Sequence, residues 1–472
     1  MAWPARVDAP PMWLGSTCQV PGLFPFTTPS GTPLVGVPLG PNLVNGSIVC
    51  FDPLSWFKAG LLSNPSIFVL STPGRGKSTL VRRMVTGLAG FGVLPLVLGD
   101  LKPDYVDLIG ALGGQVVSLG PERGCLNVLD AREANDAARR LVAAGRGDLA
   151  RQVRGDYLDR RVSVVESLVA ISRAGKVSDR ESTVLQRAVE VLDEKVCDPV
   201  LADLLAVIKN PPEAVLDVAA VDGDVAQYRK VFRDLEASLT GLVAGGRLGR
   251  FFSGHTDEPM RRDLPVCYDI SSIPEGRNDM AAAALMACWS TGFGVVNIAH
   301  ALADAGLEPD RQYFVVMDEM WRALRAGSGM VDRIDTLSRL NRQLGVAEAM
   351  LSHTPSDLVS MLDEADKAKA RGLISRSGAV VLGAMPREDM PLLSDAVELK
   401  PNEQETLIGW SGRSGWGTRP GTGVAPGLGQ FMVKVGGRPG ITFRTVLTDE
   451  ERDLNDTNRR WHEQSRIGAT RR

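Results

Sequence analysis

One stretch of the sequence limits the possible folds more than any other: a glycine-rich loop between an apolar segment and an expected helix. The run Ile-Phe-Val-Leu at 67–70 predicts a buried strand, and a helix is expected over 78–88. The loop at 71–79 reads Ser-Thr-Pro-Gly-Arg-Gly-Lys-Ser-Thr. It nearly matches the pattern G-x-x-x-x-G-K-[ST], with Ser71 in place of the first glycine. Such a loop needs a strand before it and a helix after it, so it predicts an α/β fold.

The same loop predicts a nucleotide site. Its backbone N–H groups and the positive end of the helix dipole favour phosphate oxygens. We expect the site to bind ATP, with the Lys77 ammonium reaching the β- and γ-phosphates and the Ser78 hydroxyl holding Mg²⁺. A glycine-rich turn that only caps a helix is the alternative, and the coincidence of strand, loop, lysine and helix argues against it. The predicted nucleotide-binding residues are Thr72, Pro73, Gly74, Arg75, Gly76, Lys77, Ser78 and Thr79.

A second apolar strand, expected over 313–317, ends in the carboxylates Asp318 and Glu319. In nucleotide hydrolases with a phosphate-binding loop, an aspartate at such a strand end helps to hold Mg²⁺. We therefore predict Asp318 as a metal-site residue and Glu319 as the group that polarises the attacking water. A solvated strand end is the alternative, and the pair gains its weight from the loop at 71–79 in the same chain.

Two more residues are catalytic candidates. His353 follows a strand expected over 347–351, where a polar side chain could sense the γ-phosphate or order the attacking water. A structural hydrogen bond is the alternative for His353. Arg342 lies near the end of an amphipathic helix expected over 330–344 and could act as an arginine finger on the nucleotide of a neighbouring subunit. An arginine on a solvated helix face is the alternative for Arg342.

The pattern of strands and helices divides the chain. Their alternation over 61–130 and again over 251–460 predicts a core with a mostly parallel central sheet. Residues 131–250 show no strand pattern, and their apolar residues recur at helical spacing, which predicts an inserted all-α subdomain. The proline- and glycine-rich residues 1–60 predict an irregular lead-in with two or three short strands, and 461–472 a C-terminal tail.

Composition argues against several other classes of protein. A formal net charge of −3 and an aromatic share of 6% disfavour binding of nucleic acid through a global positive field or through stacked rings. The six cysteines include no C-x-x-C pair, which is typical of reduced thiols. The segment 281–303 contains no Asp, Glu, Lys or Arg and has the length of a membrane span. Its polar residues and its flanks of mixed charge favour a buried helix packed on a sheet instead.

Taken in order, these motifs resemble the CagE/TrbE/VirB family of type IV secretion ATPases, within the wider HerA/FtsK-like group of P-loop motors. The likeness extends over about residues 35–460. Its Asp-Glu-x-Trp and Gly-Gly…Asn-x-x-Asp elements are more specific than the phosphate-binding loop. The matching segments are the loop at 71–79, Asp100-x-Lys102-x-x-Tyr105, 112–119, 126–130, 266–270, 316–321, Arg342 and 352–358.

The resemblance implies a RecA-like P-loop motor core with a helical insertion. It implies that ATP hydrolysis energises conjugative DNA transfer or substrate secretion from the cytoplasmic face of the cell membrane. It also implies a homo-oligomer, most commonly a hexamer, that works with other components of a secretion or conjugation complex. Single-stranded DNA or a nucleoprotein would be the candidate substrate. Within the chain, it assigns Arg342 to the arginine that precedes the sensor strand.

Three positions depart from the family. Ser71 replaces the usual glycine, Gln343 follows Arg342 where lysine is common, and His353 stands where glutamine is usual. Family members often carry a sizeable N-terminal domain, which we expect to be missing here or supplied by another chain.

Two alternatives to a secretion ATPase stay open. The first is a DNA-translocating motor of the coupling-protein type, which DNA-stimulated turnover would favour. The second is a nucleotide-binding assembly scaffold with little turnover. The intact Glu319 argues against a scaffold, whereas the unusual His353 keeps it open.

Overall fold

A central sheet organises the part of the chain that the computed structural model describes, which is residues 32–120, 123–221, 223–243, 248–324, 346–356, 364–412 and 426–454. The strands of this sheet are β3 (Ser66–Leu70), β4 (Leu94–Asp100), β5 (Gln115–Ser118), β6 (Val266–Asp269), β7 (Tyr313–Met317), β8 (Ala347–Ser352), β9 (Ala379–Leu382), β10 (Gln430–Lys434) and β11 (Ile441–Arg444). Seven strands run parallel in the order β9-β3-β8-β7-β4-β6-β5. The hairpin β10–β11 extends the β9 edge in antiparallel fashion. The predicted mostly parallel sheet is confirmed.

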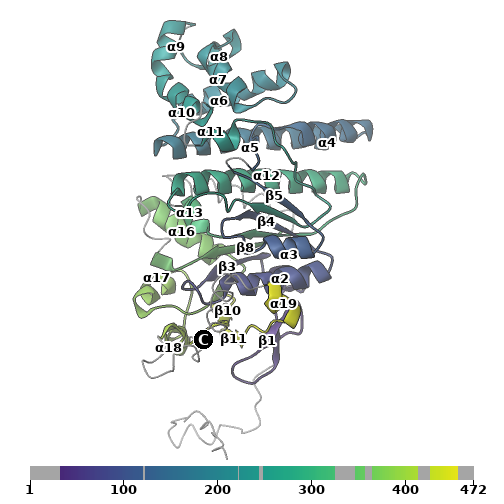
Figure 1. Cartoon of the computed structure of the whole chain (residues 1–472), viewed down its shortest axis with the longest axis vertical. Helices are drawn as coiled ribbons and strands as arrows, with labels where there is room; N and C mark the ends of the chain where they lie inside the picture. Colours follow the sequence, from purple (N-terminus) through teal and green to yellow (C-terminus); the bar gives the residue numbers. More distant parts are fainter. Residues whose placement is uncertain are drawn as a thin grey trace, which may run out of the picture.

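Helices cover both faces of the sheet (Figure 1). In β3, Phe68 and Leu70 belong to one hydrophobic cluster and Ile67 and Val69 to another, because successive side chains point to opposite faces. Burial on both faces explains why this strand is an unbroken apolar run. On the Phe68 side lie α12 (Asn278–Asp304), α13 (Met320–Leu324) and α16 (Glu364–Arg376), and on the Ile67 side α2 (Lys77–Gly90) and α3 (Val106–Ala111).

The uncharged segment at 281–303 lies in α12. Among the described residues, α12 is the one helix long and apolar enough to cross a membrane, and 89% of its most apolar window is buried within the protein. It packs against β4 on one side and against α5 (Gly147–Arg173) on the other. Gly292 permits the close approach to the sheet, since a Cβ there would lie 2.5 Å from Leu98 Cδ2. The predicted buried helix is confirmed.

The all-α insertion is also confirmed: the described residues between Asp130 and Val266 contain helices and no strand. Figure 1 shows these helices stacked beyond α12, on the side of the sheet away from α2. Helix α6 begins with a capping box formed by Ser178 and Glu181. Besides α5, the helices are α4 (Arg132–Ala143), α6 (Asp179–Lys195), α7 (Leu201–Lys209), α8 (Glu213–Val218), α9 (Val225–Val231), α10 (Arg233–Val243) and α11 (Gly249–Phe252).

Short elements flank the core. The lead-in forms an antiparallel pair, β1 (Pro38–Pro41) and β2 (Ile48–Cys50), followed by helix α1 (Pro53–Lys58), which sequence reading did not anticipate. Helices α17 (Met390–Ser394) and α18 (Pro401–Ser411) connect β9 to β10, and α19 (Asp449–Leu454) follows the β10–β11 hairpin. The helix expected over 330–344 lies outside the described residues.

Candidate active site

The strand order brings the predicted site residues together. The carboxyl ends of parallel strands meet at one edge of a sheet. In the order β3-β8-β7-β4, these ends carry the glycine-rich loop, His353, the pair Asp318 and Glu319, and the segment 100–105. They enclose a cavity of about 350 Å³. The cavity is lined by Pro73, Gly74, Gly76, Lys77, Ser78, Thr79, Arg82, Asp100, Leu101, Lys102, Asp104, Asp318, Glu319, His353 and Leu428.

The glycine-rich loop turns through two glycines with left-handed backbone. Gly74 and Gly76 have φ angles of 72° and 94°, a region that glycine enters without steric cost. Gly76 is the N-cap of α2, and Lys77 is the first residue of that helix. The loop and the N-terminus of α2 therefore line the cavity together, which is the arrangement that binds phosphate.

Ser71, the departure from the loop pattern, fits its position without strain. It is fully buried and is not among the non-glycine residues with positive φ. Its hydroxyl lies 3.4 Å from the carbonyl oxygen of Ala384. A Cβ on Gly383 would lie 2.4 Å from Ser71 Oγ, so the glycine at the end of β9 provides the space that the serine needs.

A chain of polar contacts crosses the cavity from the loop to β4. Lys77 Nζ donates to the carbonyl oxygen of Ser71 at 3.0 Å and lies 2.9 Å from His353 Nδ1. Because a lysine ammonium has no acceptor, Nδ1 must accept this bond, and the ring proton lies on Nε2. His353 Nε2 is 3.4 Å from Glu319 Oε2. His353 therefore connects the lysine of the loop to the carboxylate at the end of β7.

Glu319 is held in place by its neighbours. Lys102 Nζ lies 2.6 Å from Oε1, and Trp321 Nε1 donates to Oε2. Burial raises the pKa of the Glu319 carboxyl, but hydrogen bonds from His353 and Lys102 outweigh burial and hold it well below its usual range. Glu319 also has a φ of 51°, a left-handed conformation that costs a non-glycine residue roughly 1–2 kcal/mol. The carboxylate is therefore ionised and oriented at the cost of local backbone strain.

A second group of side chains has the chemistry of a Mg²⁺ site. Asp318 is partly buried, and this burial together with the neighbouring Glu319 raises its pKa to about 6. Burial likewise raises the pKa of Asp104. A hydrogen bond with the Ser78 hydroxyl acts in the opposite direction and lowers this pKa. Two partly buried carboxylates beside a hydroxyl offer the oxygen ligands that Mg²⁺ prefers. A divalent cation would also offset the rise that burial causes in both pKa values. Ser78, Asp104 and Asp318 therefore fit a Mg²⁺ ion that is also held by phosphate oxygens.

Asp100 shapes the loop that carries Lys102 and Asp104. Its carboxylate accepts the backbone N–H groups of Lys102, Asp104 and Tyr105 at 3.3, 3.1 and 2.7 Å. Burial raises the Asp100 pKa to about 7, against the effect of these hydrogen bonds. The Tyr105 hydroxyl in turn donates to Asp318 Oδ2 at 3.3 Å. This loop thus orients groups on both sides of the cavity.

Two predicted nucleotide-binding side chains contact protein carbonyls instead of lining the cavity. Thr72 donates from its N–H and its hydroxyl to Ala384 O at 3.0 and 3.2 Å. Arg75 donates to Pro426 O at 2.6 Å and to Ser411 O at 3.4 Å. These bonds attach the loop to the segment that follows β9, to the end of α18 and to the segment before β10. Arg342 lies outside the described residues, so its role stays a prediction.

Sequence reasoning did not assign roles to Lys102, Asp104 and Trp321. The first two lie in the Asp-x-Lys-x-x-Tyr element, whose place at the end of a strand beside the loop was a visible signal. Trp321 lies in the Asp-Glu-x-Trp element, and its contact with Glu319 two residues earlier depends on the left-handed turn at that glutamate. Only the folded backbone shows that turn.

No protein-family model and no curated protein sequence matches this chain. Solved structures do. The structure of VirB4 from Thermoanaerobacter pseudethanolicus superposes with a TM-score of 0.63 at 16% identity, covering 89% of this chain and all of that one. This chain has the fold of VirB4. Because the match covers 89% of this chain, it extends into both the sheet and the helical insertion.

The plasmid coupling protein TrwB has a related fold. Its complex with ADP and Mg²⁺ matches with a TM-score of 0.50 at 12% identity, covering 82% of this chain and 85% of that chain. Its complex with the non-hydrolysable ATP analogue ADPNP matches with the same score at 13% identity. The likeness to VirB4 and TrwB confirms the predicted RecA-like P-loop fold with an all-α insertion.

Proposed function

We propose that this protein is an ATPase that energises a type IV secretion or conjugation channel from the cytoplasmic face of the membrane. The observation that carries the proposal is the approach of Glu319, ionised and oriented, to the loop lysine through a single histidine. A fold shared with the full length of the solved VirB4 chain supports the choice of system.

The residues would divide the work as follows. Lys77 would leave His353 for the β- and γ-phosphates when ATP binds, since phosphate is the stronger acceptor. Ser78 and Asp318, with Asp104, would hold Mg²⁺, which supplies positive charge to the phosphates. Glu319 would orient and polarise the attacking water, and its lowered pKa keeps it ionised for this purpose. His353, released by Lys77, would keep its contact with Glu319.

Two variants test this assignment. Lys77→Ala should lose ATP turnover, because Lys77 is the cation of the loop that faces the cavity. Glu319→Gln should bind ATP and hydrolyse it at least about 10²-fold more slowly, because the carboxamide keeps the shape and loses the charge.

Steady-state phosphate release measures ATP turnover, and equilibrium binding of a fluorescent ATP analogue measures ATP binding. Lys58→Ala, which alters a lysine that contacts Gln312 away from the cavity, is the matched control. A Glu319→Gln protein with normal turnover would contradict the assignment.

A coupling-type motor is the second candidate, supported by the related fold of TrwB. The two functions differ in their response to DNA. If single-stranded DNA raises ATP turnover several-fold and a matched polyanion such as heparin does not, the result would favour the DNA motor. A protein that binds ATP with wild-type Glu319 and shows no turnover under any of these conditions would indicate an assembly scaffold.

We further propose a homo-oligomer, a hexamer, in which Arg342 reaches the nucleotide of the next subunit. Transition-state charge on the γ-phosphate calls for a cation beyond Lys77 and Mg²⁺. The partners would be the membrane components of the channel, and the transported substrate single-stranded DNA or a nucleoprotein.

A further inference from the structure

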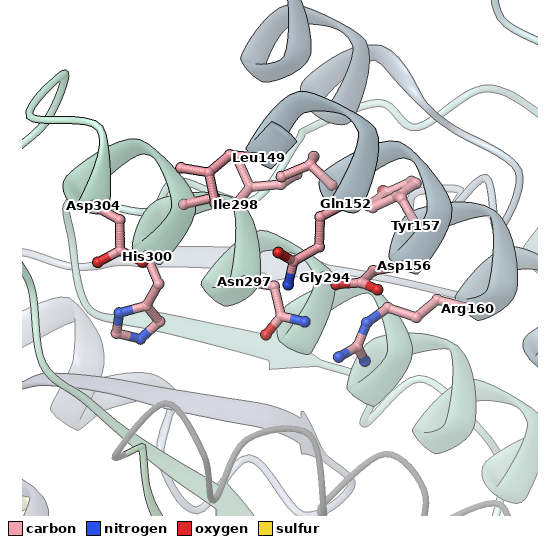
Figure 2. Close-up of a pocket in the computed structure, with 12 residues that line it drawn as sticks. Leu149, Gln152, Asp156, Tyr157, Arg160, Gly294, Asn297, Ile298, His300 and Asp304 are labelled. Atoms are coloured by element: carbon pink, nitrogen blue, oxygen red, sulfur yellow. The ribbon is translucent and has the colours of Figure 1, made fainter. Parts of the chain in front are cut away.

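A second cavity lies between α5 of the insertion and α12 of the core (Figure 2). It shares no lining residue with the cavity at the glycine-rich loop. The helices α5 and α12 approach closely at Gly294, where a Cβ would lie 3.0 Å from Tyr157 Cε2. The cavity is therefore a gap at the junction of insertion and core, beside a tight helix crossing.

Arg160 is the unusual residue of this cavity. Its side chain is buried, with 5% of the residue exposed, and none of its three guanidinium nitrogens has a hydrogen-bond partner among the described residues. In Figure 2 its side chain extends from α5 toward α12, the helix that carries Asn297. Burial lowers the Arg160 pKa to about 10, although the negative charge of Asp156 acts in the opposite direction. Buried charges in proteins are normally paired and hydrogen-bonded, and within the described part of the chain this guanidinium has no hydrogen-bonded anion.

Two further polar atoms in the cavity lack partners. Asn297 Oδ1 and His300 Nε2, both on α12, are buried without a hydrogen bond among the described residues. Buried polar atoms usually have a partner, either protein, water or ligand. The cavity thus offers a cation on α5 and, on α12, an amide oxygen that can accept a hydrogen bond, a combination that fits an anion carrying a hydroxyl or N–H group.

Two carboxylates also line the cavity, and neither satisfies Arg160. Asp156 and Asp304 form no ion pair with it among the described residues. In Figure 2, Asp304 lies beside His300 at the end of the cavity away from Arg160. Asp156 is one helical turn from Arg160 and raises its pKa by proximity without contacting it. The unpaired guanidinium is therefore a local feature of one end of the cavity.

We propose that this cavity binds a small oxyanion, a phosphate or carboxylate group, with Arg160 as its cationic ligand. Asn297 Oδ1 would accept a hydrogen bond from a hydroxyl or N–H group where the anion carries one. The cavity measures about 120 Å³, several times the room that one water requires, so it fits a group of a few non-hydrogen atoms. Guanidinium binds both anions through parallel N–H···O bonds. A bound anion would connect the insertion to the core through α5 and α12.

The test uses the full-length protein with Lys77→Ala, which removes the loop lysine as a competing phosphate ligand. Inorganic phosphate and succinate are titrated separately by calorimetry at constant ionic strength, with chloride as the reference anion. We expect one anion per chain at this site. We expect affinity to fall roughly tenfold or more when Arg160→Met is added, since a hydrogen-bonded charge is lost. Arg154→Met, which changes an exposed arginine on the same helix, is the matched control and should leave affinity unchanged.

The anion that binds more tightly shows which chemical group the cavity accepts. Binding of phosphate with little binding of succinate indicates a phosphoryl group, and the reverse indicates a carboxylate. Binding of neither anion, or equal binding by the Arg160→Met protein, would overturn the proposal and leave water as the occupant of the cavity.

A second measurement does not depend on how Arg160→Met folds. Hydrogen exchange of the Lys77→Ala protein with intact Arg160 should slow in α5 near 150–160 and in α12 near 290–300 when phosphate or succinate replaces chloride. Helix α2 is the internal reference and should not respond. Equal exchange in these α5 and α12 segments with both anions and with chloride would contradict a site between the two helices.

Discussion

At the scale of single residues, His353 is the position where this chain differs most informatively from the family it resembles. Its two ring nitrogens contact Lys77 and Glu319. A glutamine carboxamide could make the same pair of contacts, with its oxygen accepting from the lysine and its N–H group donating to the glutamate. The usual residue and the residue found here are therefore chemically equivalent in this geometry.

This equivalence gives a prediction. His353→Gln should keep turnover within a few-fold of wild type, whereas His353→Leu should lower it roughly tenfold or more, because Glu319 loses a donor and Lys77 an acceptor. Steady-state ATP hydrolysis, with ATP binding measured alongside, separates the two. Equal activity of the glutamine and leucine variants would mean that the contacts in the structure do not matter for turnover.

Asp100 gives a prediction about stability and pH. Burial raises its pKa to about 7, so between about pH 4 and 7 the folded state holds a proton that the unfolded state has lost. The stabilising contribution of Asp100 to the free energy of unfolding is therefore fully present below pH 4 and is lost as pH rises through 7. Asp100→Asn, which does not titrate, should reduce the fall in unfolding free energy from pH 5 to pH 8 by roughly 2 kcal/mol.

Urea unfolding of the nucleotide-free protein at both pH values measures this difference. The exposed Asp107→Asn in helix α3 is the control and should show the wild-type dependence. The same pH dependence in Asp100→Asn as in wild type would show that Asp100 ionises normally.

At the scale of elements, one buried ion pair attaches α18 to the C-terminal hairpin. Lys434 on β10 lies 3.1 Å from Glu403 Oε2 near the start of α18, and their side chains are 1% and 7% exposed. Glu403 also accepts the backbone N–H groups of Lys400 and Gly440. Removing the lysine would leave a carboxylate buried without its counter-charge.

We therefore expect Lys434→Met to lower the free energy of unfolding by roughly 3–5 kcal/mol. Arg387 and Glu405 form an exposed pair at the same α18, with 70% and 63% side-chain exposure, and Arg387→Met should cost less than about 1 kcal/mol. Chemical denaturation of both variants tests the contrast. Similar losses in the two would show that burial does not set the strength of these pairs.

At the scale of the whole molecule, the prediction concerns assembly. If Arg342 completes the site of a neighbouring subunit, monomers should turn over slowly, and specific activity should rise with oligomerisation. An arginine finger contributes roughly 10³–10⁵ in rate where it acts. Arg342→Ala should assemble and stay slow, and mixing it with Lys77→Ala should partly restore turnover, because each variant supplies the half-site that the other lacks.

Light scattering and turnover, measured over the same range of protein concentrations, provide the test. Constant specific activity while monomer converts to oligomer, with no rescue on mixing, would reject a shared site. A mixture of Lys77→Ala with Glu319→Gln is the control, since both changes disable the same half-site and no rescue is expected.

The sequence by itself determined the features whose cause is local. The loop at 71–79, the strand ending in Asp318 and Glu319, the burial of α12 and the helical insertion could all be predicted, because glycine placement, apolar runs and periodicity act over a few residues. Helices α16, α17 and α18 were not predicted, since their sequences carry little periodic signal and their packing on the core decides them.

The tertiary structure alone decided which residues meet. Strand β8 inserts between β3 and β7, and this order places His353 between Lys77 and Glu319 although the three are far apart in the chain. In the same way, the packing of α5 against α12 buries Arg160, whose guanidinium has no hydrogen-bond partner in the part of the chain that the structure describes. Local sequence specifies strands and helices, but the order in which strands pair and the side chains that burial brings together follow from long-range packing.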